Sequence, residues 1–160
     1  MPTPAQSPAP TLGFQFKLYY CAAGIGATPT WVEFKEVRTV DRKDADTEAD
    51  VTIRGSGGFK TVMNGETELS HDIEFPYYGN GTAYAALLAA KVGKTVIGIA
   101  DMDGAIVPAT GVTVNGIWYD ACVSSLDVSE PIDGNAAMVK CKLSPGPSAN
   151  IPVRKTVTGA

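Results

Sequence analysis

The stretch Glu66-Thr67-Glu68-Leu69-Ser70-His71-Asp72-Ile73-Glu74-Phe75 alternates residue by residue between two kinds of side chain. Successive side chains of a β-strand point to opposite faces of the sheet, so the acids and Ser70 fall on one face. Leu69, Ile73 and Phe75 fall on the other face, together with Thr67 and His71. This pattern predicts a half-buried strand and favours a mainly β fold.

The flanking sequence predicts further strands, separated by turn residues. Asn64-Gly65, directly before the alternating stretch, is typical of a tight hairpin turn, and Asp133-Gly134 predicts another turn. With the alternating stretch the total is about eight strands, and the others are expected at 14–21, 31–40, 51–54, 59–63, 95–100, 112–124 and 136–143.

One helix is expected after the alternating strand. Thr82 is suited to its N-cap, the Ala-rich run 83–91 has high helix propensity, and Gly93 suits the C-terminal cap. Leu87 and Leu88 are expected to hold this helix against the sheet.

The whole chain of 160 residues fits one domain. Many short strands with frequent Gly and Pro predict a β-sandwich or barrel with one flanking helix. We expect an extended N-terminal arm at 1–12, which contains four prolines, the β domain at 13–143, and an extended C-terminal arm at 144–160.

Two charged segments are interpreted as loops. Residues 41–50 combine acidic side chains with the basic Arg42 and Lys43, and this mixture of opposite charges is interpreted as a solvated loop rather than an acidic tail. Asp101-Met102-Asp103-Gly104 resembles the start of a calcium-binding loop, but Val112 stands where that loop needs its glutamate, so we expect an ordinary turn.

The reactive side chains do not form the pattern of an enzyme. The single histidine, His71, lies on the apolar face of a strand without a nucleophile motif, so a packed, hydrogen-bonded role is expected. Cys21, Cys122 and Cys141 are widely spaced, which favours free thiols over a metal site. We expect no catalytic activity, no metal and no cofactor.

Charge and hydropathy exclude two further classes of protein. The net charge is −4 and Lys and Arg form no cluster, so the chain lacks the cationic surface that grips nucleic acid. No apolar run approaches the length of a membrane-spanning helix, and the N-terminus does not resemble a signal peptide.

The acids of the alternating strand allow three interpretations. Glu66, Glu68, Asp72 and Glu74 are a solvated strand face paired with Lys or Arg on neighbouring strands, or an electrostatically repulsive surface such as a channel wall, or a catalytic pair. A glycosidase normally draws its acids from a carbohydrate cleft edged with aromatic residues, and the sequence shows no such edge, so the catalytic interpretation is the weakest.

Several segments together resemble the major tail protein, or tail tube protein, of long-tailed phages, a family similar in fold to the tube protein of type VI secretion systems. The segments are Trp31-Val32-Glu33-Phe34-Lys35-Glu36-Val37, Asp50-Val51-Thr52-Ile53-Arg54-Gly55-Ser56-Gly57-Gly58-Phe59-Lys60, Gly116-Ile117-Trp118-Tyr119-Asp120-Ala121-Cys122-Val123-Ser124-Ser125, and Leu126-Asp127-Val128-Ser129-Glu130-Pro131-Ile132-Asp133-Gly134-Asn135-Ala136. The resemblance covers about residues 14–143.

The resemblance implies a β-sandwich with one helix, hexameric rings whose sheets merge into an inner barrel, and stacked rings that form the tail tube of the virion. It implies assembly in the host bacterial cytoplasm, other tail proteins at the tube ends, and a lumen through which the tape measure protein and DNA pass without specific binding. The loop at about 41–58 would reach the neighbouring ring; its charged residues are Asp41, Arg42, Lys43, Asp44, Asp46, Glu48, Asp50 and Arg54. Lumens of the family tend to be negative, so we expect Glu66, Glu68, Asp72 and Glu74 to include lumen residues.

One alternative stays open beside the tube. A non-enzymatic β-sandwich that binds or decorates a phage capsid or tail has a similar composition. Exposed aromatic residues clustered at loop tips would favour this alternative, whereas strand edges that join neighbouring subunits would favour the tube.

Overall fold

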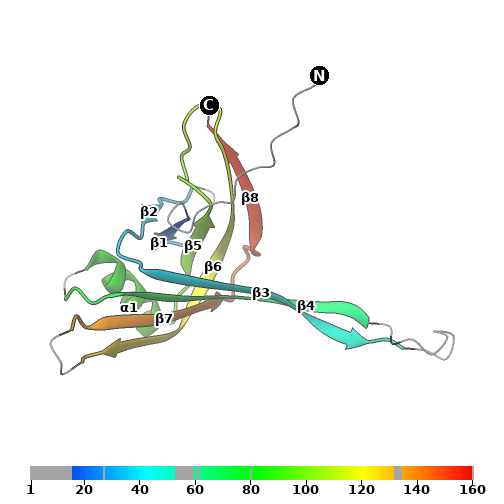
Figure 1. Ribbon diagram of the computed structural model, residues 1–160, viewed down its shortest axis with the longest axis horizontal. Coiled ribbons are helices and arrows are strands. Elements are labelled where there is room, and N and C mark those ends of the chain that lie inside the picture. Colours follow the sequence, from blue (N-terminus) through cyan, green and yellow to red (C-terminus); the bar gives the residue numbers. More distant parts are fainter. Residues whose placement is uncertain are drawn as a thin grey trace, which may run out of the picture.

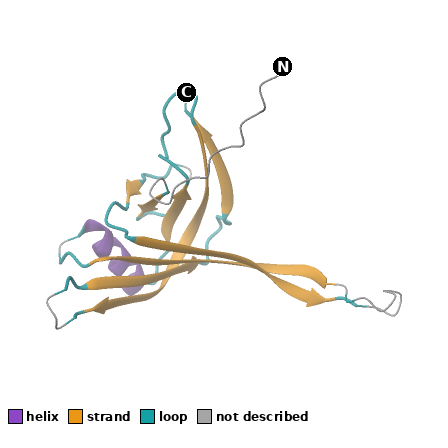
Figure 2. Ribbon diagram, viewed as in Figure 1, coloured by secondary structure: helices purple, strands orange, loops and turns teal. Residues whose placement is uncertain are grey.

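The computed structural model describes residues 16–26, 28–52, 60, 62–79, 81–131 and 135–159. The expected N-terminal arm at 1–12, Arg54 and the Asp133-Gly134 turn lie outside these residues. The described part contains eight strands and one helix, which confirms a mainly β fold with one helix (Figures 1 and 2). They are β1 (Lys17–Cys21), β2 (Val32–Glu33), β3 (Thr39–Asp50), β4 (Val62–Pro76), α1 (Thr82–Gly93), β5 (Ile97–Met102), β6 (Thr113–Ser129), β7 (Met138–Pro145) and β8 (Val153–Thr158).

All named strands belong to one antiparallel sheet that is not closed into a barrel. The order is β2-β1-β5-β6-β7-β4-β3, and β8 pairs with β6. The long strand β6 pairs with β5 along one edge, whereas its other edge pairs first with β8 and then with β7. In Figure 1 the β3–β4 hairpin runs across the direction of β8 and upper β6, and its distal part projects from the body.

The main core lies where the two parts of this sheet and α1 meet. Leu18 on β1 and Ile99 on β5 belong to the same buried cluster as Ile73 on β4 and Val139 on β7. A second, smaller cluster on the opposite face of β1, β5 and β6 contains Tyr19, Met102 and Val114. Both faces of β5 are therefore buried, which explains why four consecutive residues, Ile97 to Ala100, have no polar side chain.

The alternating strand is confirmed within β4. Leu69, His71, Ile73 and Phe75 are buried, whereas the acids between them are exposed or half-buried. Thr67 lies on the same face but is exposed, because this part of β4 extends beyond the core of the subunit.

The helix is confirmed, with different ends and a narrower contact face. Its N-cap is Gly81 rather than Thr82, and the left-handed residue at its C-terminal end is Lys94, with φ 51°, rather than Gly93. Leu87 is only 1% exposed, but Leu88 is 40% exposed and does not hold the helix to the sheet. Adjacent residues of a helix point about 100° apart, so one of them faces solvent.

The predicted loop at 41–50 is wrong, since these residues form most of β3. All ten are exposed in the single chain, so neither face of the strand carries the apolar alternation by which a strand is recognised. The predicted turn at Asn64-Gly65 is also wrong, because both residues lie inside β4. The pairing of β3 with β4 shifts register between Asp46 and Glu48, and a Cβ added to Gly65 would meet Thr47 Oγ1 at 2.6 Å. Because Gly65 has no side chain, it allows the two strands to approach closely at a bulge.

Other strand limits also differ from the sequence predictions. Only Val32 and Glu33 of the expected 31–40 strand belong to β2, and β6 continues to Ser129. β5 includes Asp101 and Met102, so the expected turn begins later, with bends at Asp103 and Gly104. Residues 136–143 are not the last strand: the C-terminal segment is extended, and its residues 153–158 form β8 along β6.

Candidate assembly surfaces

The outer face of the β3–β4–β7 layer carries acids and lysines side by side. Asp72 lies opposite Lys142 and Glu74 opposite Lys140 in the register of β4 with β7. On the other side of β4, Lys43 Nζ of β3 lies 3.3 Å from Asp72 Oδ2. A surface groove of about 300 Å³ runs between these side chains. Asp72 is therefore ion-paired with a lysine of β3, and Asp72 and Glu74 both lie opposite lysines of β7, an arrangement that favours the first of the three interpretations.

Glu66 and Glu68 lie farther out on the same face of β4. The pairing with β7 begins only at His71, so both glutamates belong to the projecting part of the hairpin and are exposed. Glu68 faces Ala45 of β3 instead of a lysine. The structure thus divides the four predicted lumen acids into a set that lies opposite lysines, Asp72 and Glu74, and an outer set, Glu66 and Glu68.

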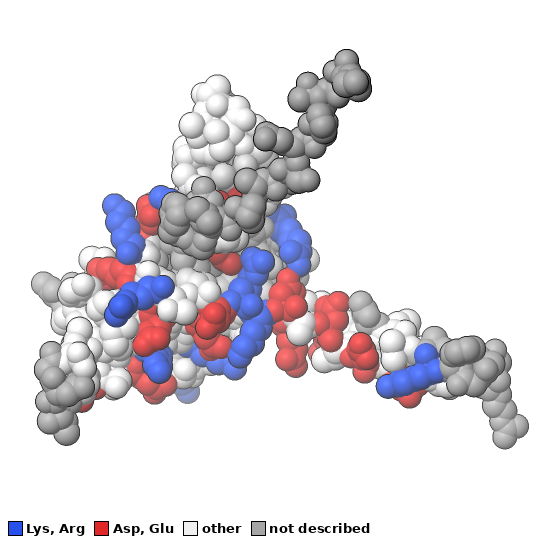
Figure 3. All heavy atoms as spheres, in the orientation of Figure 1, with Lys and Arg blue, Asp and Glu red and all other residues white. Residues whose placement is uncertain are grey.

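β3 of the hairpin contains all the described charged residues that sequence analysis placed in an inter-ring loop, and Arg54 lies outside the described residues. Asp41 to Asp50 lie along β3, and Figure 3 shows Asp and Glu side chains spaced along the projecting part. Near its distal end three apolar side chains are exposed, with 37% of Val51, 42% of Val62 and 59% of Met63 accessible to solvent. A surface with exposed apolar side chains beside acids is typical of a contact site.

A chain of polar contacts, buried except at Arg42, fixes the base of this hairpin to the body. Arg42 Nη1 of β3 lies 3.1 Å from Asp101 Oδ2 of β5, and His71 Nε2 of β4 lies 3.2 Å from the same oxygen. The Tyr119 hydroxyl of β6 lies 2.6 Å from His71 Nδ1, and the two rings stack. Burial, followed by the nearby Asp101 charge, raises the pKa of Tyr119, so its hydroxyl stays protonated and donates. His71 Nδ1 then accepts, and Nε2–H donates to Asp101.

The expected packed role of His71 is confirmed by this geometry. Sequence reasoning did not find its partners, because Asp101 and Tyr119 are distant in the chain and meet His71 only through the sheet order. A second ion pair, Arg154 Nη2 of β8 with Asp44 Oδ2 of β3, links the hairpin to the C-terminal segment farther out.

The Asp120 carboxylate, on β6, holds two loops in place. It accepts hydrogen bonds from Ile25 N–H at 2.7 Å, Ser148 Oγ at 2.5 Å and Asn150 Nδ2 at 2.9 Å. Burial opposes its ionisation, but these three hydrogen bonds outweigh burial and lower the pKa of Asp120. The segment that leads into β8 is anchored in this way.

Several strand edges are open in the described part of the chain: β2 and β8 each pair on one side only, and two further open edges lie on β3 and β6. β3 ends the sheet order and pairs only with β4. On the edge of β6 that faces β5, pairing ends at Ala121, so the residues after it have no strand on that side. Such edges are ready to pair with another chain.

The described residues include no group of three His, Cys, Asp or Glu side chains placed to hold a metal ion. Within the same part of the chain, the helix is too short to cross a membrane.

The fold is that of tube-forming subunits. The chain is similar to the SPP1 tail tube, with TM-score 0.69 and 13% identity over 93% of this chain and 81% of that chain. It is similar to a chain in the virion of the native gene transfer agent particle, with TM-score 0.66 and 12% identity over 90% and 98% of the two chains. For a chain in the PVC sheath–tube complex of an extracellular contractile injection system, the TM-score is 0.54 and the identity 13%, over 92% and 93%.

These likenesses confirm the tail tube fold that the sequence segments implied. No known family profile and no curated protein sequence matches the chain. At 12–13% identity these structures show the architecture of the chain.

Proposed function

We propose that this chain is the structural, non-enzymatic subunit of a tail tube, and that its copies form stacked hexameric rings in the tail of a virion. The single observation that carries the proposal is the tail tube fold together with two open strand edges, on β3 and on β6 after Ala121. An open edge is a liability in a monomer, whereas in a ring it pairs with the next subunit and continues the sheet.

The outer face of β3, β4 and β7 suits the wall of a conduit for DNA. Asp41 shares this face with the four acids of β4, so acids outnumber the lysines at 43, 140 and 142. A wall with excess negative charge repels phosphates and releases no counterions on contact, so DNA slides without adhering. We assign Glu66, Glu68, Asp72 and Glu74 to this lumen surface, through which the tape measure protein and DNA pass.

The hairpin supplies contacts between rings. Its charged residues lie on β3, whose distal part projects from the body, instead of on a loop; they are Asp41, Arg42, Lys43, Asp44, Asp46, Glu48 and Asp50. Other tail proteins would cap the tube ends, and assembly would take place in the host cytoplasm.

Electron microscopy of the purified protein tests assembly. Rings or tubes support the proposal, whereas a protein that stays monomeric at high concentration refutes it. For the lumen, Glu66 and Glu68 changed together to Lys should leave tubes intact and impair genome ejection, and the matched Gln variant should eject almost normally. Normal ejection by the Lys variant would refute the lumen assignment. Asp72 and Glu74 are left unchanged in this test, because they face lysines of β7.

A decoration module is the competing function, favoured by one observation. Tyr77 and Tyr78, in the loop after β4, are 38% and 52% exposed. If Tyr77→Ser with Tyr78→Ser abolished binding to preformed capsids or tails while the protein itself formed no tubes, the decoration role would replace the tube.

A further inference from the structure

One face of β3 meets a single row of the body sheet at two points. Asp101 of β5, Ile117 of β6 and Arg154 of β8 form this row, because Ile117 is in register with both of the others. Arg42 of β3 contacts Asp101 at one end of the row, and Asp44 of β3 contacts Arg154 at the other end. The polarity is reversed between the two ends, since β3 supplies the cation at the first contact and the acid at the second.

Two contacts on different strands define a direction, whereas one contact is only a pivot. Arg42 and Asp44 are two residues apart, so they point to the same face of β3 and lie about 7 Å apart along it. β5 and β8 flank β6, so their backbones lie about 10 Å apart. A slip of β3 by two residues would bring Asp44 to Asp101, where the like charges would repel.

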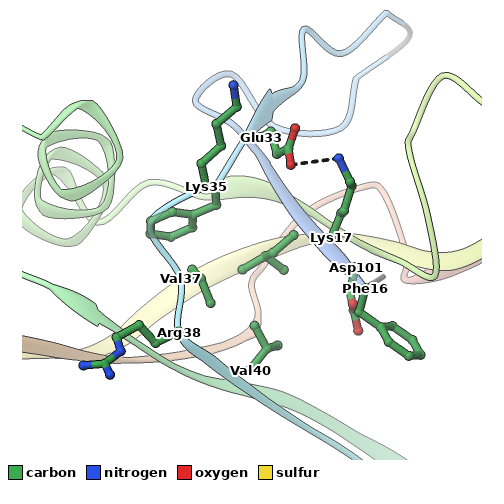
Figure 4. Close-up of a pocket in the computed structure, with 10 residues that line it drawn as sticks. Phe16, Lys17, Glu33, Lys35, Val37, Arg38, Val40 and Asp101 are labelled. Atoms are coloured by element: carbon green, nitrogen blue, oxygen red, sulfur yellow. Dashed lines mark hydrogen bonds and ion pairs between the residues drawn. The ribbon is translucent and has the colours of Figure 1, made fainter. Parts of the chain in front are cut away.

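Packing leaves the hairpin room to turn about its base. A hollow of about 720 Å³ lies there, and its walls include both Val40 of β3 and Asp101 of β5 (Figure 4). The pairing of β4 with β7 ends at His71, and Asp44 lies beyond that point, so β7 does not reach this part of the hairpin. Arg154 is a body residue that does reach it.

The strand that carries Arg154 is itself held in place. β8 pairs with β6 from Val153 to Thr158, and Asp120 accepts hydrogen bonds from Ser148 and Asn150 in the segment before β8. The side chain of Arg154 is 74% exposed, and an ion pair this exposed contributes little to the free energy of unfolding. Its effect is therefore on the direction of the hairpin rather than on the stability of the fold.

We propose that Asp44 and Arg154 are positioning residues, whose ion pair, together with that of Arg42 and Asp101, fixes the direction in which the β3–β4 hairpin leaves the body. β8 is then a brace for the hairpin. The inference deepens the proposed tube function, and its consequence for assembly rests on that function. Where hairpins supply the contacts between rings, their direction sets the rotation of one ring against the next.

Distances between two spin labels test the direction in the monomer. Labels at Glu48→Cys on β3 and Lys91→Cys on α1 report the position of the hairpin relative to the body. The background carries Cys122→Ser, because this thiol is half-buried, whereas Cys21 and Cys141 are buried. Double electron–electron resonance, at a concentration where the protein is monomeric, gives the distribution of label distances.

Three variants change the charges of the pair: Arg154→Glu, Asp44→Arg, and the two together. The control is Lys155→Glu, which changes the net charge as much as Arg154→Glu does. Lys155 is the next residue of β8, and its Nζ lies 5.5 Å from the centre of the Trp118 ring instead of beside β3. Circular dichroism checks the folding of each variant.

Each single variant of the pair should broaden the distance distribution at least about twofold, because like charges then face each other and the hairpin turns away from β8. The charge-swapped variant should return the width to within roughly 1.3-fold of the unchanged protein, since the ion pair is restored in reverse. The Lys155→Glu control should keep the unchanged width.

Two results would overturn the positioning role while leaving the tube function intact. One is a distribution as narrow in Arg154→Glu as in the unchanged protein, and the other is a charge-swapped variant as broad as the single variants. In tubes viewed by electron cryomicroscopy, Arg154→Glu should alter the rotation between successive rings, and an unaltered rotation would refute the consequence for stacking. A protein that forms no tubes even without substitutions would refute the tube function, and the label distances would still decide the direction of the hairpin.

Discussion

The buried contacts at the hairpin base allow a quantitative prediction of how substitutions change the free energy of unfolding. Tyr119 and His71 are both fully buried, and the Tyr119 hydroxyl donates to His71 Nδ1 at 2.6 Å. Tyr119→Phe leaves that nitrogen without a donor, which should lower the free energy of unfolding by about 1–3 kcal/mol. His71→Phe leaves both the Tyr119 hydroxyl and one contact of the Asp101 carboxylate unmade, so it should cost about 3–5 kcal/mol.

The double variant separates the pair from its surroundings. Once His71 is Phe, removing the Tyr119 hydroxyl removes an unsatisfied buried group, so the double variant should be more stable than the sum of the single effects predicts, by about 1–2 kcal/mol. Urea unfolding followed by circular dichroism, under conditions where the protein is monomeric, gives all four free energies. A coupling below about 0.5 kcal/mol would show that the 2.6 Å contact does not stabilise the fold, and would refute the reasoning.

Three further predictions concern the body of the subunit. Leu87→Ala should lower the free energy of unfolding by about 2–5 kcal/mol, whereas the matched Leu88→Ala should lower it by less than about 1 kcal/mol; equal effects by urea unfolding would contradict the described helix face. Because the folded-state pKa of Asp120 lies below its ordinary value of 3.8, the stability it contributes is present above that pH and is lost as the pH falls through the folded pKa. Asp120→Asn should therefore flatten the acid limb of the curve of stability against pH, and an unchanged limb would exclude this contribution. Burial raises the pKa of Cys141 to about 12, so iodoacetamide at pH 8 should modify half-buried Cys122 first in the folded protein; mass spectrometry showing Cys141 modified first would contradict its burial.

Sequence patterns correctly predict those strands and helices that have one buried face and one exposed face. Residues 66–75 alternate because β4 has the core on one side and solvent on the other over most of that length. The helix was found for a related reason, since its Ala-rich run has high helix propensity. Its contact face was predicted too broadly, because a pair of adjacent leucines does not indicate which of them is buried.

The missed strand, β3, is exposed on both faces in a single chain, so its sequence carries charges where a strand usually shows alternation. Its partner is identified only by the long-range register with β4. Asn64-Gly65 was misread because the same dipeptide that favours a turn also permits close approach at a bulge, where Gly65 meets Thr47. The contacts of His71 with Asp101 and Tyr119 depend on which strands are neighbours, and local patterns do not contain that information.

The 17-residue strand β6 also has a mechanical consequence. It is hydrogen-bonded to β5, β7 and β8, and antiparallel hydrogen bonds lie perpendicular to the strands. A force that pulls along β6 therefore loads many of these hydrogen bonds together in shear. A force that pulls an edge strand away from the sheet, parallel to the hydrogen bonds, would instead break the bonds one after another. The subunit is stiff along β6 and yields most readily at its open edges, so neighbouring copies that cover those edges would reinforce it in its weakest direction.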